Sequence, residues 1–310
     1  MVLWYLLRSI RPRQWLKNLV VFASITFAGQ LFLPHKFYPV LYTFLILNLL
    51  VSGIYLINDV ADIRRDRVHY FKKNRPVAKG LLSPLLATCL ALIFIASALT
   101  SSYFLNRYLF LILSSFLVIQ ILYTFYFKHI ILLDIITIAA TFMMRIFAGF
   151  LVVSNTEPLT VLSSWLILTT VMLSLFLVVA KRRLELILMT HKVATAHRDT
   201  LSQYPTLLLD GLTFMTATAT ILTYSLFTFN QPEYTKSLIT PLLPQALSSP
   251  KWLMITIPLV IYGVFRYLYL IYGKKEGESP ERLVIEDGPM FLTVTSWGVA
   301  VITIVYFINR

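Results

Sequence analysis

The sequence is poor in cysteine, and it lacks several motifs that mark common enzyme classes. Its only cysteine, Cys89, lies inside a hydrophobic run of a 310-residue chain, which excludes a disulfide framework and is typical of a buried, inert thiol. There is no Gly-rich phosphate loop, no G-x-S-x-G motif and no C-x-x-C motif. Any chemistry must therefore come from other polar side chains.

Acidic residues are also few, with 14 Asp and Glu against 27 Lys and Arg, for a formal net charge of +13. A nucleic-acid partner is not predicted from this excess, because the basic residues gather in loops between apolar runs, as membrane orientation requires. The chain is 58% hydrophobic, and its mean hydropathy is +0.76. These values are typical of a polytopic membrane protein embedded in a lipid bilayer.

Nine hydrophobic runs are long enough to cross a bilayer as helices. They cover residues 15–33, 38–57, 82–100, 107–127, 131–153, 161–180, 207–228, 251–272 and 289–308. No soluble domain fits between them, so residues 1–310 are predicted to form one all-α integral-membrane domain. The first residues lack the cleavage site of a signal peptide, and we expect them to stay attached.

The loops have a strong charge asymmetry. With the N-terminus inside and the C-terminus outside, the inner loops cover residues 58–81, 128–130, 181–206 and 273–288. All Lys and Arg residues but six then lie on the cytoplasmic side, the exceptions being Lys36, Arg107, Arg145, Lys236, Lys251 and Arg310. The positive-inside rule favours this orientation, with any active site on the cytoplasmic side.

An acidic segment ends the second run, where Asn58 is followed by Asp59, Asp62 and Asp66. If the helix continues, the three carboxylates are three and four residues apart and point from one face. A divalent cation would relieve their repulsion, because Mg²⁺ binds one or two carboxylates together with phosphate oxygens. The alternative is a solvated, acidic helix end.

Basic segments flank this acidic one on both sides. Arg11, Arg13 and Trp15 are interpreted as an interfacial anchor, whereas Lys17 and Asn18 lie at the mouth of the first run, where they could reach a phosphate. In the loop after the carboxylates, the candidates for phosphate binding are Arg75 and Lys79. The alternative for this loop is positive-inside charge without a ligand.

Further candidates lie in the fourth, fifth and sixth runs. Tyr123 and Lys128 end the fourth run and Asp134 begins the fifth, either as an aromatic belt with a snorkelling cation or as part of the same site. Arg145, deep in a span, is expected to pair with a carboxylate or bind an anionic group. Lys181, Arg182 and Glu185 share a helical face after the sixth run, either as a lipid anchor or as the second half of a site.

Several of these segments resemble one known superfamily. The pattern Asn58-Asp59-x-x-Asp62-x-x-x-Asp66 after the second run is similar to the first aspartate-rich motif of UbiA-type intramembrane prenyltransferases. The resemblance implies a UbiA-like helical bundle whose cytoplasm-facing cavity holds a Mg²⁺-diphosphate, with Mn²⁺ as an alternative metal. Most members have a second aspartate-rich motif after the sixth span, where this chain has Lys181-Arg182-Arg183-Leu184-Glu185.

One branch of the superfamily is more closely similar, the phosphoribosyltransferases that act on decaprenyl phosphate. The shared stretches are 11–18, Asn58-Asp59-Val60, Arg75-Pro76, Lys128-His129, Leu133-Asp134, Ala180-Lys181-Arg182 with Glu185-Leu186, and Arg266-Tyr267. The resemblance implies transfer of 5-phosphoribose from phosphoribosyl diphosphate to a polyprenyl phosphate in the inner (plasma) membrane. Asp59, Asp62 and Asp66 would hold the metal, and the cations would hold phosphates.

Two other functions stay open. An ordinary prenyltransferase would move a prenyl group to an aromatic or other lipophilic acceptor, but the missing second aspartate motif argues against it. A transporter or scaffold would have ionisable residues spread through the bilayer, whereas Arg145 is nearly alone there. The oligomeric state is open, a homo-oligomer included.

Overall fold

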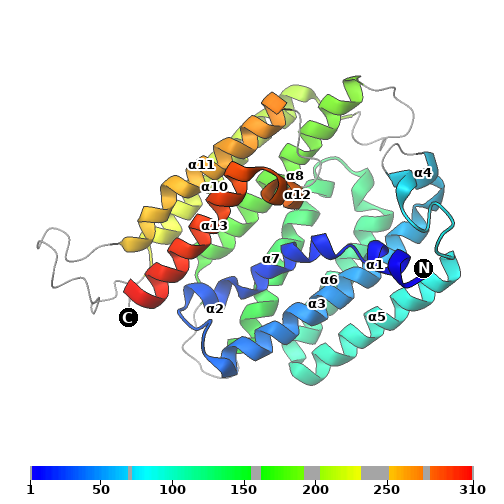
Figure 1. Ribbon diagram of the computed structural model, residues 1–310, viewed down its shortest axis with the longest axis horizontal. Coiled ribbons are helices and arrows are strands. Elements are labelled where there is room, and N and C mark those ends of the chain that lie inside the picture. The colour runs from blue at the N-terminus through cyan, green and yellow to red at the C-terminus, as the bar shows by residue number, and fades with distance from the viewer. Residues whose placement is uncertain are drawn as a thin grey trace, which may run out of the picture.

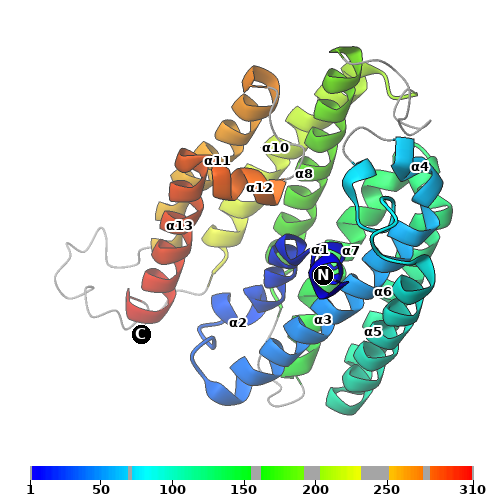
Figure 2. The same ribbon diagram turned by 45° about the vertical axis from the view of Figure 1, so that its right-hand side comes forward.

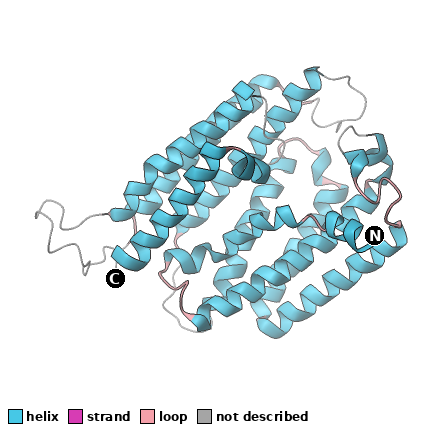
Figure 3. Ribbon diagram, viewed as in Figure 1, coloured by secondary structure: helices cyan, strands magenta, loops and turns pink. Residues whose placement is uncertain are grey.

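The computed structural model describes residues 2–68, 72–154, 162–191, 203–231, 251–274 and 280–308. All regular structure in these ranges is helical (Figure 3). The long helices run side by side as a bundle (Figure 1): α3 (Pro34–Ala61), α5 (Pro84–Leu105), α6 (Arg107–Phe125), α7 (Leu133–Ser154), α8 (Ser164–His191), α10 (Thr206–Phe229), α11 (Ile257–Tyr269) and α13 (Gly288–Thr303). The prediction of an all-α bundle is confirmed.

Shorter helical pieces join or extend these helices. Before α3 lie α1 (Val2–Ser9), the 3₁₀ helix η1 (Pro12–Phe22) and α2 (Ala23–Phe27). The others are α4 (Ile63–Val68), the 3₁₀ turns η2 (Lys72–Asn74), η3 (Phe127–His129) and η6 (Trp252–Thr256), the π-helical segments η7 (Leu270–Lys274) and η8 (Ile304–Ile308), and α12 (Pro280–Glu286).

In the described part of the chain, 8 helical segments are long and apolar enough to span a membrane. They match the second to ninth runs of the sequence. The first run, 15–33, instead contains most of η1 and all of α2, so the count differs by one. Helix α8 continues to His191, past the predicted end at residue 180, and Arg182 pairs with Glu185 at helical spacing in this extension. Residues 69–71, 192–202 and 275–279 of the expected inner loops lie outside the described residues.

Large apolar side chains cover the outside of the bundle, as lipid contact requires. Leu85, Phe104 and Leu207 are 76%, 82% and 84% exposed. The prediction of a buried Cys89 is wrong, since this residue is exposed on the outer face of α5. Apolar residues of a membrane helix need not face the protein core, because lipid is as favourable a neighbour.

The helices fall into two groups, with α3, α5 and α6 on one side of the bundle and α10, α11 and α13 on the other (Figure 2). Each group contains a cluster of buried apolar residues. In the first group, Leu47 and Leu50 of α3 pack with Phe116 of α6 and with residues of α5 and α7. In the second group, Phe176 of α8 packs with Tyr267 of α11 and with α10, η7 and α13. The C-terminal ends of α3 and α8 lie at the same end of the bundle (Figure 1). Ion pairs form there, among them Asp66 with Arg75 and Asp134 with Arg182.

Candidate active site

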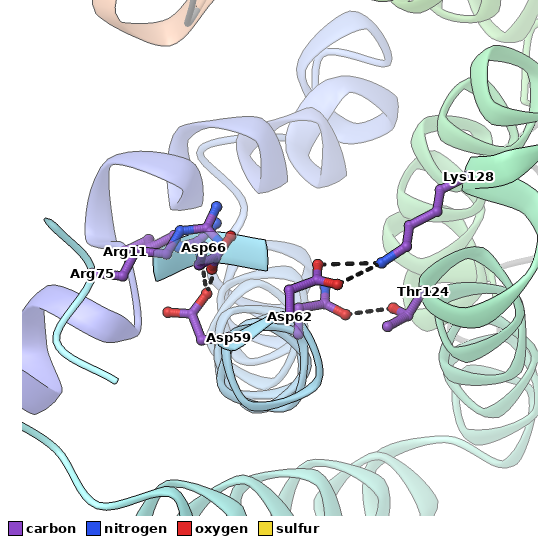
Figure 4. A network of polar contacts seen from close by, with 8 residues as sticks. Arg11, Asp59, Asp62, Asp66, Arg75, Thr124 and Lys128 are labelled. Atoms are coloured by element: carbon purple, nitrogen blue, oxygen red, sulfur yellow. Dashed lines mark hydrogen bonds and ion pairs between the residues drawn. The ribbon is translucent and has the colours of Figure 1, made fainter. Parts of the chain in front are cut away.

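The acidic segment is divided at Asp62, where α3 ends and α4 begins. Asp62 has φ −95° and ψ 9°, outside the α-helical region, and α4 starts at the next residue. The expectation that Asp59, Asp62 and Asp66 point from one face is therefore wrong, because it required one continuous helix. Figure 4 shows Asp62 pointing away from Asp59 and Asp66.

Asp59 and Asp66 are bridged by Arg75, and Asp59 has a second arginine partner. Arg75 Nη1 lies 2.5 Å from Asp66 Oδ2 and 3.2 Å from Asp59 Oδ1, and Arg11 also pairs with Asp59 Oδ1 (Figure 4). The two aspartates are 1% and 2% exposed. The second oxygen of Asp59, Oδ2, is buried without a hydrogen-bond partner among the described residues. A buried carboxylate oxygen without a partner is unfavourable unless a ligand satisfies it.

The third carboxylate faces the other side of the helix. Lys128 Nζ of η3 lies 2.9 Å from Asp62 Oδ1 and 3.2 Å from Oδ2 (Figure 4). Beside it, Thr124 of α6 donates to the side-chain oxygen of Asn58. Of the two alternatives for Lys128, this contact agrees with membership of the same site, and a role in phosphate binding stays a prediction. The α3–α4 cluster is defined here as Arg11, Asn58, Asp59, Asp62, Asp66, Arg75, Thr124 and Lys128.

Asp66 is the carboxylate of the α3–α4 cluster whose pKa is shifted by its surroundings. Burial raises the pKa of Asp66 above the usual carboxyl range, and nearby Asp59 raises it further. Arg75 and Lys72 offset part of this rise. A cation bound beside Asp66 would stabilise its ionised form.

A second polar cluster lies on α8 and the helices around it. Arg182, 6% exposed, donates from Nε to Asp134 Oδ2 at 2.9 Å and from Nη1 to Glu185 Oε2 at 2.6 Å. Its Nη2 reaches the Tyr123 hydroxyl at 3.4 Å, and Lys181 lies 4.0 Å from Glu185. The α8 cluster is defined here as Tyr123, Asp134, Lys181, Arg182, Glu185 and Tyr204.

Tyr204 completes the α8 cluster, and no sequence motif marks it. Its hydroxyl donates to Asp134 Oδ1 at 2.7 Å and accepts from the Leu132 amide at 2.6 Å. Burial and the hydrogen bond to Asp134 raise the pKa of Tyr204. The Tyr204 hydroxyl and the Arg182 guanidinium thus hold the two oxygens of the Asp134 carboxylate.

Two predicted residues lie away from both clusters, in the middle of the bundle. Arg145 donates from Nε to Asn18 Oδ1 at 2.7 Å, and no carboxylate of the described residues pairs with it. Pairing of Arg145 with a carboxylate, one of the two expectations, is therefore wrong within the described residues, because a neutral amide, Thr141 and aromatic rings surround the guanidinium. Binding of an anionic group, the other expectation, stays a prediction. Asn18 is fully buried rather than at the mouth of a span.

The remaining basic residues divide between the surface and the site. Lys17 donates to Gln14 at 2.5 Å within η1, and Lys79 is exposed on the loop after η2. Arg11 and Trp15 differ from the predicted interfacial anchor, because Arg11 pairs with Asp59 and Trp15 donates to Ser52 at 3.3 Å inside the bundle. The sequence contains no signal for the Arg11 contact, which spans 48 positions.

The carboxylates of the α3–α4 cluster fit a Mg²⁺ ion only if a bound ligand supplies further oxygen atoms to the metal. No three His, Cys, Asp or Glu side chains of the described residues lie close enough to hold a metal by themselves. Mg²⁺ needs only one or two carboxylates when phosphate oxygens complete its shell. Asp59 with its unsatisfied Oδ2 and the adjacent Asp66 provide two such carboxylates.

The structure contains a groove of about 510 Å³ that does not touch either cluster. It lies between η6 and α13 and is lined by Trp252, Ile255 and α13 side chains such as Val299. The expected cytoplasm-facing cavity stays a prediction.

The fold and the two clusters define an α-helical integral-membrane protein with charged side chains gathered at one end of its bundle. The UbiA prenyltransferase family matches this chain over residues 19–295. The protein belongs to the UbiA prenyltransferase family.

Its relatives include several phosphoribosyltransferases. The decaprenyl-phosphate phosphoribosyltransferase of Mycobacterium tuberculosis (strain H37Rv) is 30% identical over 294 residues, which cover 94% of this chain and 90% of that protein. The protein of the same name from Corynebacterium glutamicum is 27% identical over 305 residues, covering 97% of this chain and 86% of that protein.

Solved structures share the fold. A UbiA homolog from Archaeoglobus fulgidus bound to GPP and Mg²⁺ has a TM-score of 0.64 and 19% identity, covering 96% of this chain and 99% of that chain. The apo structure of a UbiA homolog from Aeropyrum pernix has a TM-score of 0.57 and 13% identity, covering 92% and 97%. At these identities the likeness concerns the fold.

Proposed function

We propose that this protein transfers 5-phosphoribose from phosphoribosyl diphosphate to a membrane polyprenyl phosphate and releases diphosphate. The relatives named decaprenyl-phosphate phosphoribosyltransferase, similar over nearly the whole chain, support this assignment. In the reaction, the bond between ribose C1 and the diphosphate oxygen breaks, and its electron pair leaves with diphosphate. A phosphate oxygen of the lipid forms the new bond to C1.

The main geometric support for this proposal comes from the end of α6, which supplies one residue to each of the two clusters. Thr124 bonds to Asn58 of the α3–α4 cluster, and its neighbour Tyr123 accepts from Arg182 of the α8 cluster. A cluster with three carboxylates thus lies beside a cluster centred on a buried arginine. This pairing suits a metal-bound diphosphate on one side and a phosphate monoester on the other.

The α3–α4 cluster is proposed to bind the donor. Asp59 and Asp66 would hold the Mg²⁺ ion, with Asp62 and Asn58 beside them, and Mn²⁺ has similar preferences for oxygen ligands. When bound, the ion neutralises charge that develops on the leaving diphosphate. Arg11, Arg75 and Lys128 would exchange their carboxylate partners for phosphate oxygens, and Lys17 and Lys79 would add positive charge nearby.

The α8 cluster is proposed to bind the acceptor phosphate and the ribose. Arg182 is oriented by Asp134, so one edge of its guanidinium has a defined direction. Arg182 and Lys181 would hold phosphate oxygens, Glu185 would accept from a ribose hydroxyl, and Tyr123 would border the site. An ionised phosphate is already nucleophilic, so no side chain has to remove a proton.

The proposed location is the inner (plasma) membrane, with the two clusters on the cytoplasmic side. The charge asymmetry of the loops supports an N-terminus inside and a C-terminus outside. The donor is a soluble, multiply charged molecule and would enter from that side. The lipid would reach the site from the bilayer, with its tail along apolar helix faces.

Purified protein in detergent, incubated with labelled phosphoribosyl diphosphate, a polyprenyl phosphate and Mg²⁺, tests the proposal. We expect a labelled lipid product that requires both the metal and the lipid phosphate. A parallel reaction with a prenyl diphosphate and an aromatic acceptor tests ordinary prenyl transfer. No labelled lipid in the first reaction, together with turnover in the second, would refute the proposal.

A further inference from the structure

The buried contact between Arg145 and Asn18 joins three elements that are far apart in sequence. Arg145 of α7 donates to the side-chain oxygen of Asn18 in η1, and Asn18 donates to Asn48 of α3 at 2.7 Å. The three residues are 5%, 0% and 4% exposed. The guanidinium also lies 4.9 Å from the ring centroid of Phe116 and 5.0 Å from that of Phe142. Such a buried arginine is expensive in a bilayer and needs a reason.

The element that Asn18 belongs to depends on tertiary contacts. Helix η1 is a 3₁₀ helix of 11 residues, whereas 3₁₀ helices of more than about 3–4 residues are uncommon because their hydrogen bonds have poorer geometry. Its own backbone bonds are therefore a weak constraint on its position. Contacts with α3 and α7 have to supply the rest.

A glycine provides the second of these contacts. A Cβ atom added at Gly149 of α7 would lie 2.0 Å from the carbonyl oxygen of Val21 in η1. The two backbones are thus in direct contact, four residues along α7 from Arg145. Any side chain at position 149 would displace η1.

The residue directly before η1 reaches the α3–α4 cluster. Arg11, which precedes η1, has a left-handed φ of 52° and pairs with Asp59. Arg11 lies seven positions before Asn18, which corresponds to about 14 Å at a rise of roughly 2.0 Å per residue of 3₁₀ helix. A shift of η1 along its axis would therefore move Arg11 relative to Asp59.

We propose that Arg145 is a positioning residue that, through Asn18 and with Gly149, fixes the axial position of η1 and so the place of Arg11 in the donor site. The proposal rests on the assignment of the α3–α4 cluster to donor binding. It assigns Arg145 no contact with substrate. We therefore expect substitutions of Arg145 or Gly149, in the middle of the bundle, to weaken donor binding at the α3–α4 cluster.

A distance measurement tests the position of η1 directly. Spin labels are attached to the native Cys89 of α5 and to a Leu16→Cys substitution on η1, both exposed positions. Arg145→Met and Gly149→Ala should shift or broaden the distance between the labels by at least about 2 Å, one 3₁₀ residue. Gly211→Ala is the matched control, since a Cβ at this helical glycine meets nothing within 4 Å. An unchanged distance in both test variants would overturn the proposal.

Kinetics and binding separate positioning from simple stability. Arg145→Met and Gly149→Ala should raise the KM for phosphoribosyl diphosphate about tenfold and change kcat by less than about threefold, because only a binding contact is misplaced. Loss of kcat at constant KM would indicate unfolding alone and would overturn the proposal. The affinity of each variant for Mg²⁺ with inorganic diphosphate, measured by calorimetry, should fall in parallel. This binding test applies even if no phosphoribose is transferred, so failure of the proposed function would be recognised separately.

Discussion

The three carboxylates of the α3–α4 cluster differ in how fully they are paired. Lys128 contacts both oxygens of Asp62, and Arg75 pairs with Asp66. Asp59 combines near-complete burial with an oxygen that has no partner in the described part of the chain. In the proposed donor site, this is therefore the oxygen that we expect to bind the metal.

Asp59→Asn tests this difference. The amide keeps the size of the side chain but loses its negative charge, so we expect transferase activity to fall at least about 100-fold. Glu286→Gln is the control, because Glu286 forms an exposed pair with Arg282 outside both clusters, and we expect it to change activity less than about twofold. Full activity of Asp59→Asn in the labelled-lipid assay would remove Asp59 from the metal site.

Arg182 and Arg183 offer a matched pair of neighbouring arginines on different faces of α8. Arg182 belongs to the α8 cluster, whereas Arg183 pairs with Asp210 of α10 at 2.6 Å. Because lysine cannot reproduce the two directed contacts of Arg182, we expect Arg182→Lys to raise the KM for polyprenyl phosphate about tenfold or more. Arg183→Lys should leave that KM within about threefold. Equal effects of the two substitutions on the lipid KM would contradict the proposed acceptor site.

At the scale of elements, polar residues at helix ends determine where the spans begin and end. Asn106 ends α5 and caps α6, accepting from the Tyr108 amide at 2.7 Å and the Leu109 amide at 3.2 Å. Asp287 caps α13 through the Met290 amide at 3.0 Å and also accepts from Arg266 of α11. A single carboxylate thus stabilises one helix end and joins two spans.

The cap at Asp287 predicts a pH dependence of stability. The hydrogen bond from Arg266 lowers the pKa of Asp287, and a carboxyl with a lowered folded pKa stabilises the fold above its unfolded pKa of about 3.9. That contribution is lost as the pH falls through the folded pKa. The difference in Tm between wild type and Asp287→Asn should therefore be constant from about pH 7 to 5 and shrink below about pH 4.

Asp287→Ala separates the cap from the charge. Asparagine is also a good cap, so Asp287→Ala should be less stable than Asp287→Asn by about 1 kcal/mol at every pH. Thermal unfolding in detergent measures both variants. A Tm difference between wild type and Asp287→Asn that grows as the pH falls would contradict the assigned role of the carboxylate.

At the scale of the whole molecule, the two clusters lie at one end of the bundle, and α13 with η8 ends at the other (Figure 1). The loop with Lys79 belongs to the first end, and the turn between α5 and α6, with Arg107, belongs to the second. Both side chains are exposed. Cysteines introduced at these two positions can therefore report the orientation of the protein in the membrane.

Thiol labelling tests the proposed orientation. In a Cys89→Ser background, Lys79→Cys should react with a membrane-impermeant reagent only in inverted vesicles, and Arg107→Cys only in right-side-out vesicles or cells. The reason is that positive charge is retained on the cytoplasmic side. The reverse pattern would place the site outside and contradict entry of the donor from the cytoplasm.

The sequence by itself determined the fold class and most of the spans. Hydrophobic runs of about 20 residues have one stable solution in a bilayer, which is a helix, because every backbone group must be satisfied within the segment. It also placed Asp59, Arg75, Lys128 and Arg182 at the ends of spans, since charges are excluded from hydrocarbon. These residues do lie in the two clusters.

Only the tertiary structure decided which charges meet. The turn at Asp62 separates its carboxylate from Asp59, and contacts that span 48 and 127 positions bring Arg11 to Asp59 and Arg145 to Asn18. Spacing along a helix predicts a shared face only while that helix continues. Such long-range pairs depend on how the helices pack, which no local pattern in the chain encodes.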